Sequence, residues 1–311
     1  MFAVRGIAVS LTFFVLLYAF LSLLVAIAWR WLELLHATEK TLAGWLFALR
    51  LLPLVASIAI TLAFVVPSFQ LLEPRSIHED MGVMPLALGV CALLLIAWGC
   101  FRVIIAQTTT FRVVARWLEG AHPLDAAAEA ITFRSRREAP PLTLVGVRRP
   151  RVLVSESTVA LLSRDELRIA LKHELAHVRS RDNLKKLVFR FAPFPGMAKL
   201  ESAWSQAAEL AADDAAVSNR HDAVDLAAAL VKLSRLVPVE PAPACTVGFV
   251  TGSISARVAR LLAWDEARKT RPARVHRWYA IPPVLAALVC LLVTYGPALA
   301  LTHEVTEWIV R

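Results

Sequence analysis

Cysteine is scarce in this sequence, and the cysteines present form no pattern. The chain has four cysteines in 311 residues, and none belongs to a Cys-x-x-Cys pair. Three of them lie in strongly apolar segments, and Cys245 stands alone in a polar one. A disulfide framework or a Cys-x-x-Cys redox or zinc motif would need paired, regularly spaced cysteines. These classes are therefore excluded as the basis of the fold.

The sequence also lacks internal repeats, low-complexity tracts and nucleic-acid-binding motifs. Its formal net charge of +9 does not by itself indicate a nucleic-acid partner. The basic residues are spread along one long polar segment and gather near its two ends, where they can attract anionic lipid headgroups. Membrane lipid is therefore an expected partner, and direct nucleic-acid binding is not expected.

Charged residues are absent from four long apolar segments in a chain that is 58% hydrophobic, with a mean hydropathy of +0.59. Each segment is long enough for a helix to cross the apolar layer of a bilayer, about 30 Å thick. The first is too long for the core of a signal peptide, and no small-residue cleavage site follows it. The predicted spans are about 7–29, 51–72, 84–101 and 278–301.

The cations that flank these spans predict their orientation. Residues 102–277 hold 28 of the 34 Lys and Arg residues and 18 of the 25 acidic residues. Residues 30–50 carry three cations, whereas 73–83 carry one cation against three acids. The protein is expected in the inner (cytoplasmic) membrane. Because cytoplasmic segments of membrane proteins are enriched in Lys and Arg, 30–50 and 102–277 are expected on the cytoplasmic side. Arg5 lies on the outer side in this arrangement.

The predicted fold class is mainly α, a polytopic membrane protein with four transmembrane helices and a mostly helical cytoplasmic domain with a small β-sheet. Three spans occupy 1–107, the cytoplasmic domain 108–277 and the fourth span 278–301, with a short outside tail at 302–311.

The polar domain alternates helical and β-rich patterns. The capping box of Ser163 and Glu166 starts a predicted helix at 164–180. The short runs LTLVGV and RVLVS predict a hairpin or two sheet strands. The expected helices are 111–132 (one or two), 164–180, 182–192, 198–218, 223–236 and 253–267; the expected strands are 142–147 and 151–155; the expected loops are 134–141 and 237–250.

The stretch LKHELAHVRSRDN places two histidines one helical turn apart. His173 and His177 project from one face of the predicted helix, where two imidazoles can ligate one zinc ion. The side chain of Glu174 projects from the same helical turn, slightly rotated around the helix axis from the two histidines. It can therefore act as a base on a zinc-bound water without binding the metal. This is the arrangement of His-Glu-x-x-His zinc hydrolases. A chance match is the alternative, because three fixed residues recur by accident.

A third ligand must come from another helix, and AAELAADDAAV at 207–217 offers one. Glu209 can complete three protein ligands, and Asp213, one turn later, can fix the tautomer of a ligand histidine. The neighbouring alanines indicate that both acids are buried rather than solvated. Glu201 is the alternative third ligand. Asp182 is expected to cap the next helix, with a smaller chance of holding a ligand.

These two motifs, with three spans before them and one after, resemble the BlaR/MecR-type membrane zinc metallopeptidases, which are gluzincin-like antirepressor peptidases of bacteria. The resemblance implies one Zn²⁺ per chain on His173, His177 and Glu209, with Glu174 as general base and Asp213 behind a ligand. It also implies that the strand at 151–155 pairs with substrate backbone. The expected substrate-binding residues are Arg151, Val152, Leu153, Val154 and Ser155. His221 is a candidate oxyanion donor, although a His-Asp pair more often opens a helix.

The family's antibiotic sensors carry an extracellular penicillin-binding domain after the last span, whereas only THEVTEWIVR (302–311) follows it here. The expected function is therefore cleavage of a cytoplasmic protein, such as a transcriptional repressor, and of the chain itself at Pro238–Gly252. A homodimer is a further expectation. Two alternatives stay open: an HtpX-like membrane quality-control protease, and a non-catalytic sensor or scaffold with a structural zinc.

Overall fold

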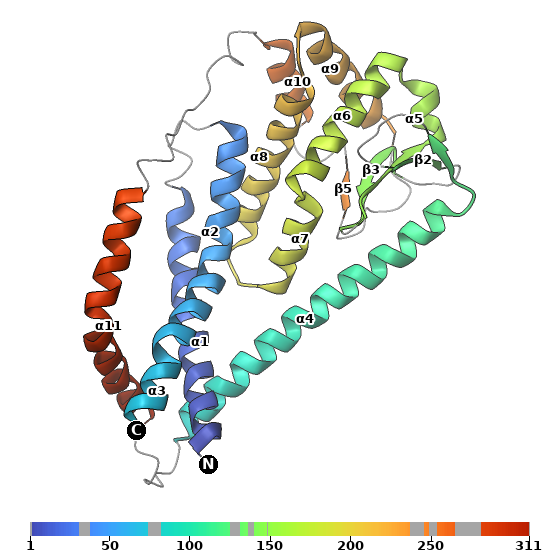
Figure 1. Cartoon of the computed structure of the whole chain (residues 1–311). Coiled ribbons are helices and arrows are strands. Elements are labelled where there is room, and N and C mark those ends of the chain that lie inside the picture. Colours follow the sequence, from blue (N-terminus) through green and yellow to red (C-terminus); the bar gives the residue numbers. More distant parts are fainter. Residues whose placement is uncertain are drawn as a thin grey trace.

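The computed structural model describes residues 2–30, 38–73, 82–124, 131–135, 140–147, 149–236, 246–248, 254–264 and 281–310. A bundle of long helices carries a domain of shorter helices and a small sheet at one end (Figure 1). The bundle consists of α1 (Phe2–Ala28), α2 (Glu39–Ile60), η2 (Thr61–Val65), α3 (Val66–Leu72), α4 (Val83–Leu118) and α11 (Ile281–Val310).

Three helices are long and apolar enough to cross a membrane: α1, the continuous helix from α2 to α3, and α4. The second and third are longer than the apolar segments that predict them. α2 begins at Glu39 and includes the charged Arg50, while α4 continues to Leu118. Residues 281–301 of the fourth predicted span lie in α11, and 278–280 lie outside the described residues; α11 is helical through Val310, where a short tail was expected. Its role as a span stays a prediction.

The long helices run back and forth between the two ends of the bundle (Figure 1). A salt bridge of 3.1 Å joins Arg5 on α1 to Glu73 after α3, so the beginning of α1 and the end of α3 lie together. The smaller helices and the sheet lie at the opposite end, where α4 terminates (Figure 1). Arg5, the one cation that disagreed with the charge rule, thus has an acidic partner at its own end.

The sheet has five strands in the order β1-β2-β4-β3-β5. They are β1 (His122–Leu124), β2 (Ile131–Ser135), β3 (Leu142–Val145), β4 (Arg151–Ser155) and β5 (Thr246–Gly248). β3 and β4 form the expected antiparallel pair, with Leu142 opposite Val154. The helical prediction for 111–132 is wrong at 122–124 and 131–132, which lie in β1 and β2, and its residues 125–130 lie outside the described ones. Pro123 cannot continue a helix, and the run Ile131–Phe133 suits a strand.

The predicted substrate-binding role of β4 must be corrected. Arg151, Val152, Leu153, Val154 and Ser155 form an interior strand, paired in parallel with β2 on one side and antiparallel with β3 on the other. Both backbone edges are therefore already used, and all of these residues except Arg151 are buried. A peptide cannot add to a strand whose two edges are paired. The strand is part of the core.

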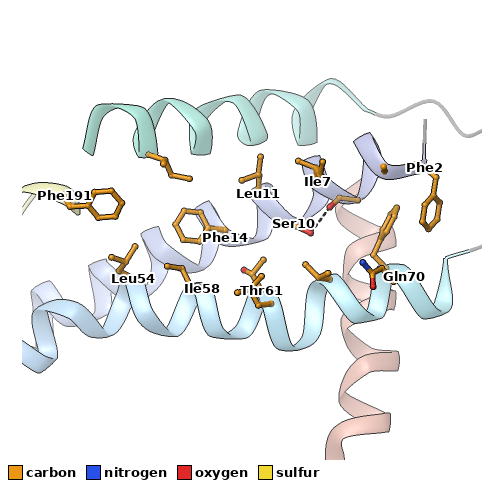
Figure 2. A pocket seen from close by; sticks show the side chains of 16 residues that line it. Phe2, Ile7, Ser10, Leu11, Phe14, Leu54, Ile58, Thr61, Gln70 and Phe191 are labelled. Atoms are coloured by element: carbon orange, nitrogen blue, oxygen red, sulfur yellow. Dashed lines mark hydrogen bonds between the residues drawn. The ribbon is translucent and has the colours of Figure 1, made fainter. Parts of the chain in front are cut away.

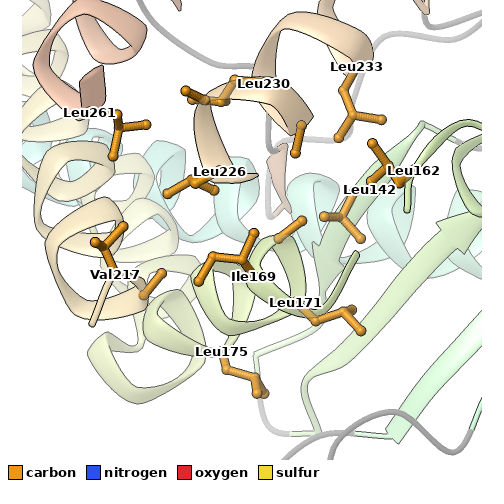
Figure 3. Close-up of a cluster of buried hydrophobic side chains, with 14 of the residues drawn as sticks. Leu142, Leu162, Ile169, Leu171, Leu175, Val217, Leu226, Leu230, Leu233 and Leu261 are labelled. Atoms are coloured by element: carbon orange, nitrogen blue, oxygen red, sulfur yellow. The ribbon is translucent and has the colours of Figure 1, made fainter. Parts of the chain in front are cut away.

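The helices of the domain lie close to their predicted positions. They are α5 (Glu156–Leu161), α6 (Arg164–Ser180), α7 (Asp182–Phe191), α8 (Ala198–Ala216), α9 (Arg220–Ser234) and α10 (Ile254–Leu262). One core joins α6, α9 and α10 to the inner face of β3 and β4; Ile169, Leu226, Leu230 and Leu261 meet there (Figure 3). This core fixes α6, the helix that carries both motif histidines.

Candidate metal centre

The capping box sets the start of α6. Ser163 accepts a hydrogen bond from the backbone N–H of Glu166, and the Glu166 carboxylate accepts one from the N–H of Ser163. Lys232 of α9 holds the same carboxylate at 2.7 Å. From this start, His173 and His177 fall on the buried face of α6, with side chains 0% and 1% exposed. The predicted helix and its buried histidines are thus both present.

Glu209 reaches the two histidines from α8. Its carboxylate is 3% exposed, and its two oxygens lie 3.6 Å from Nε2 of His173 and 3.7 Å from Nε2 of His177. The two Nε2 atoms are 3.2 Å apart. Two nitrogen ligands, each about 2.0–2.1 Å from a tetrahedral zinc, lie about 3.3 Å apart. The spacing of these three groups therefore fits a single ion.

The other ring nitrogen of each histidine faces a carboxylate. His173 Nδ1 lies 2.9 Å from Asp213, as the sequence predicts. His177 Nδ1 lies 2.8 Å from Asp182, which Lys185 also contacts at 2.9 Å. Asp182 is the first residue of α7 rather than its cap, since Arg181 takes the cap position with a left-handed φ of 54°. Both carboxylates orient the Nε2 atoms toward Glu209.

Arg257 of α10 is a member of this centre that sequence reasoning missed. Its guanidinium contacts Asp213 with two hydrogen bonds of 2.8 and 2.7 Å and Glu209 with one of 2.9 Å. The side chain is buried, so its charge offsets those of the two acids at close range. The only hint in the sequence is a cation among apolar residues in ISARVARLL, which is equally typical of a surface helix.

The carboxylates dominate the electrostatics of the centre. Burial alone would lower the pKa of His173, but the contacts with Asp213 and Glu209 outweigh it and raise that pKa to about 9. Burial would raise the pKa of Asp213, yet its contact with His173 lowers it to about 2. The pKa of Glu209 is also lowered, again because His173 outweighs burial. A centre that stabilises extra positive charge in this way favours a bound cation.

Glu174 differs from the acids around it. It is fully buried, and within the described parts of the chain neither carboxylate oxygen has a hydrogen-bond partner. Burial raises its pKa to about 7. An unpartnered buried carboxylate is costly unless it serves a ligand or a reaction. Its environment therefore suits a group that exchanges a proton with a bound molecule.

Lys186, one turn along α7 from Asp182, faces the same acids. Burial lowers its pKa, against the opposing influence of Glu209, Asp182 and Glu174. This proximity could not be predicted from the sequence, because Lys185-Lys186 resembles an ordinary charged pair on a helix surface.

Two other predicted candidates lie elsewhere. Glu201 is near the start of α8 and pairs with Arg50 at 2.9 Å, so it does not compete with Glu209 as a ligand. His221 is 79% exposed and faces Asp225 on its own helix at 3.7 Å. Because it is exposed, His221 is not part of the buried centre, and the predicted oxyanion role is wrong. His221 is instead an exposed residue in the first turn of α9.

One family model matches the part of the chain that contains this centre. A family model described as BlaR1 peptidase M56 matches residues 91–261, which is more than half of the chain and includes α6, α7, α8 and most of α10. No curated protein matches the chain. The residues that meet in the centre, His173, His177 and Glu209, lie within the matched region.

Proposed function

This chain belongs to the BlaR1 peptidase M56 family, and on that premise we propose that it is an integral-membrane zinc endopeptidase. The observation that carries the proposal is the buried group of His173, His177 and Glu209 beside the unpartnered Glu174. Three protein ligands leave a fourth position open for a reaction, whereas a structural zinc site has four.

Each residue has a defined part in the proposed reaction. Zinc held by His173, His177 and Glu209 would polarise the carbonyl of the scissile peptide bond. Glu174 takes a proton from the attacking water as the new C–O bond forms, and delivers it to the nitrogen as the C–N bond breaks. The products are a carboxylate and an amine. A pKa close to 7 lets one carboxyl group serve as both base and acid.

The strand that would receive a substrate is β3 rather than β4. β3 lies next to α6, and its outer edge pairs antiparallel with β5, with Leu144 opposite Val247. β5 comes from the segment Pro238–Gly252, whose other residues lie outside the described ones. A short strand on this edge occupies the position that an extended peptide would take by strand addition. We infer that a protein substrate displaces β5, or that the segment itself is cut.

The proposed cellular role is signalling by limited proteolysis of a cytoplasmic regulator such as a transcriptional repressor. It depends on the orientation that the flanking cations predict. On a background without native cysteines, Ser234→Cys on the exposed face of α9 should resist an impermeant thiol reagent in intact cells, while Ser76→Cys reacts. Labelling at position 234 but not at 76 would place the centre outside and contradict a cytoplasmic substrate.

Cleavage is tested by comparing protein N-termini from cells that express wild type, Glu174→Ala or Asp165→Ala. Asp165 lies on the exposed side of α6 and provides a matched loss of one acid. Glu174→Ala should keep zinc but lose the new N-termini, since it removes the base and no ligand, whereas Asp165→Ala should retain them. Identical N-termini in all three, under every stress applied, would favour a zinc-containing scaffold. Many unrelated cleaved membrane proteins would favour a quality-control protease.

A further inference from the structure

The far end of α7 lies among the membrane-type helices. A Cβ placed on Gly99 of α4 would lie 2.1 Å from the carbonyl oxygen of Phe191, so glycine is required for this approach. The hydroxyl of Tyr18 on α1 donates to the carbonyl of Pro193 at 3.2 Å. The turn that joins α7 to α8 is thus held between α1 and α4, well within the length of both helices.

Arg50 of α2 also contacts this turn, and we call the surrounding residues Gly99, Tyr18 and Arg50 the socket. It is 2% exposed, although it lies in a helix whose sequence is otherwise largely apolar. It donates to the carbonyl of Ala192 at 2.6 Å and forms a salt bridge with Glu201 of α8 at 2.9 Å. The last carbonyls of a helix lack partners within that helix, and leaving them unpaired in apolar surroundings is costly. Arg50 therefore stabilises the end of α7 at this depth.

The near end of α7 belongs to the metal centre. Asp182, its first residue, contacts Nδ1 of His177, and Asn183 donates to the carbonyls of Leu144 and Gly146 at 3.3 and 3.0 Å. The helix has ten residues and so spans about 15 Å at 1.5 Å per residue. One short helix, without an internal break, thus joins the socket to the partner of a ligand histidine.

We propose that α7 is a rigid link through which the packing of α1, α2 and α4 sets the position of Asp182, and so of His177. Gly99 and Arg50 are positioning residues in this inference, which rests on the proposed zinc site. A cavity of about 570 Å³ lies between α1, α2 and α4, and Phe191 is at one end of it (Figure 2). The end of α7 therefore has space into which it can shift. A change in helix packing around this cavity would move α7 along with its end residue.

Three glycine-to-alanine variants test the link, because they add the same methyl group in different surroundings. Gly99→Ala forces α7 away from α4. Gly89→Ala, on the same helix, meets the Ala8 carbonyl of α1 at 3.5 Å, and Gly44→Ala on α2 meets nothing within 4 Å. Gly99→Ala should weaken Zn²⁺ affinity about 10- to 100-fold, the effect of losing a ligand's carboxylate partner. The two controls should stay near wild type.

A double variant separates this route from general destabilisation. If Gly99→Ala acts through Asp182, then Gly99→Ala/Asp182→Ala should bind Zn²⁺ about as weakly as Asp182→Ala alone. Additive losses, or wild-type affinity in Gly99→Ala, would overturn the link. Arg50→Lys should retain more affinity than Arg50→Ala, because a lysine still carries donors and charge.

A measurement that needs no metal keeps the two proposals apart. In the metal-free protein, the ¹⁵N signal of His177 Nδ1 should shift in Gly99→Ala and not in Gly44→Ala. If wild type binds no Zn²⁺ but this shift is present, the zinc proposal fails and the link stands. If wild type binds Zn²⁺ and neither affinity nor signal changes in Gly99→Ala, the link fails and the zinc proposal stands.

Discussion

Two groups of histidine and carboxylate side chains lie at opposite ends of this protein, and in each group the potential ligand atoms lie within 4.8 Å of one another. His173, His177 and Glu209 form one, and Glu73, His303 and Glu307 the other. In the first group the side chains are 0–3% exposed. In the second, exposure rises to 48% at Glu307. Proximity of potential ligands therefore does not distinguish them.

What distinguishes them is the surrounding structure. Each histidine of the first group has a carboxylate on its Nδ1 atom. In the second, the carboxylate beside His303 is that of Glu307, which lies 3.6 Å from Nε2 rather than against Nδ1. Oriented ligands bind a metal more tightly than ligands that must be ordered on binding. Of these two groups, the comparison favours His173, His177 and Glu209 as the candidate metal centre, which is supported from outside by Asp182, Asp213 and Arg257.

The largest predicted effect is on metal content. Glu209→Ala should lose most of the zinc, because two histidines alone form an incomplete site. Glu73→Ala should retain the wild-type content of one zinc per chain. Elemental analysis of both purified variants measures this directly. A zinc content that falls in Glu73→Ala and stays normal in Glu209→Ala would reverse the assignment of the two groups.

The second prediction concerns the two arginines that contact these groups. Arg257→Ala leaves Glu209 and Asp213 buried without their cation, so it should destabilise the protein by about 3–5 kcal/mol. Arg5→Ala breaks a single, partly exposed ion pair at the other end, so its expected loss is smaller than that of Arg257→Ala, which leaves two carboxylates without their cation. Thermal unfolding in detergent with a chelator measures both. Added Zn²⁺ should narrow the gap to wild type for Arg257→Ala but not for Arg5→Ala, because the ion replaces the missing positive charge only beside Glu209 and Asp213.

The third prediction tests a carboxylate behind a ligand. Asp182→Ala should reduce Zn²⁺ affinity about 10- to 100-fold while leaving one zinc per chain at saturation. Asp225→Ala, which removes the acid near the exposed His221, is the matched control and should bind like wild type. Chelator competition measures the affinities. Equal affinities in the two variants would show that the contact with His177 does not orient the ligand.

The sequence predicted α6 closely because its signals are local. The capping box of Ser163 and Glu166 fixes where the helix begins, and the apolar stripe fixes which face is buried. Glu209 and Asp213 were also identifiable, since an apolar helix that carries two acids one turn apart needs partners for them. These are properties of neighbouring residues, and tertiary contacts reinforce them rather than override them.

Other features depend on long-range contacts that no local pattern records. β4 looks like a strand in sequence, but only its pairing with β2 and β3 shows that it is interior. Arg257 lies 44 residues after Asp213, and Arg50 reaches the end of α7 from a different helix. The continuous helix from α2 to α3 is longer than its predicted span, 34 residues from Glu39 to Leu72, because the charge of Arg50 placed the start of that span at residue 51.

The fourth prediction concerns the pH dependence of metal binding. The pKa of His173 is about 9, above its ordinary 6.5, because Asp213 and Glu209 stabilise the protonated ring. In the zinc-free protein this proton stabilises the fold fully below pH 6.5, and the contribution is lost as pH rises to about 9. Zinc binds the neutral ring, so below pH 9 binding must displace the proton.

Affinity for Zn²⁺ should therefore rise about tenfold per pH unit between pH 7 and 9 and then level off. Asp213→Asn removes the charge that raises the pKa, so its affinity should level off at a lower pH. Chelator competition across this range in both proteins gives the two profiles. A flat profile in wild type would mean that His173 is already neutral there, and that the carboxylates orient its ring without holding a proton on it.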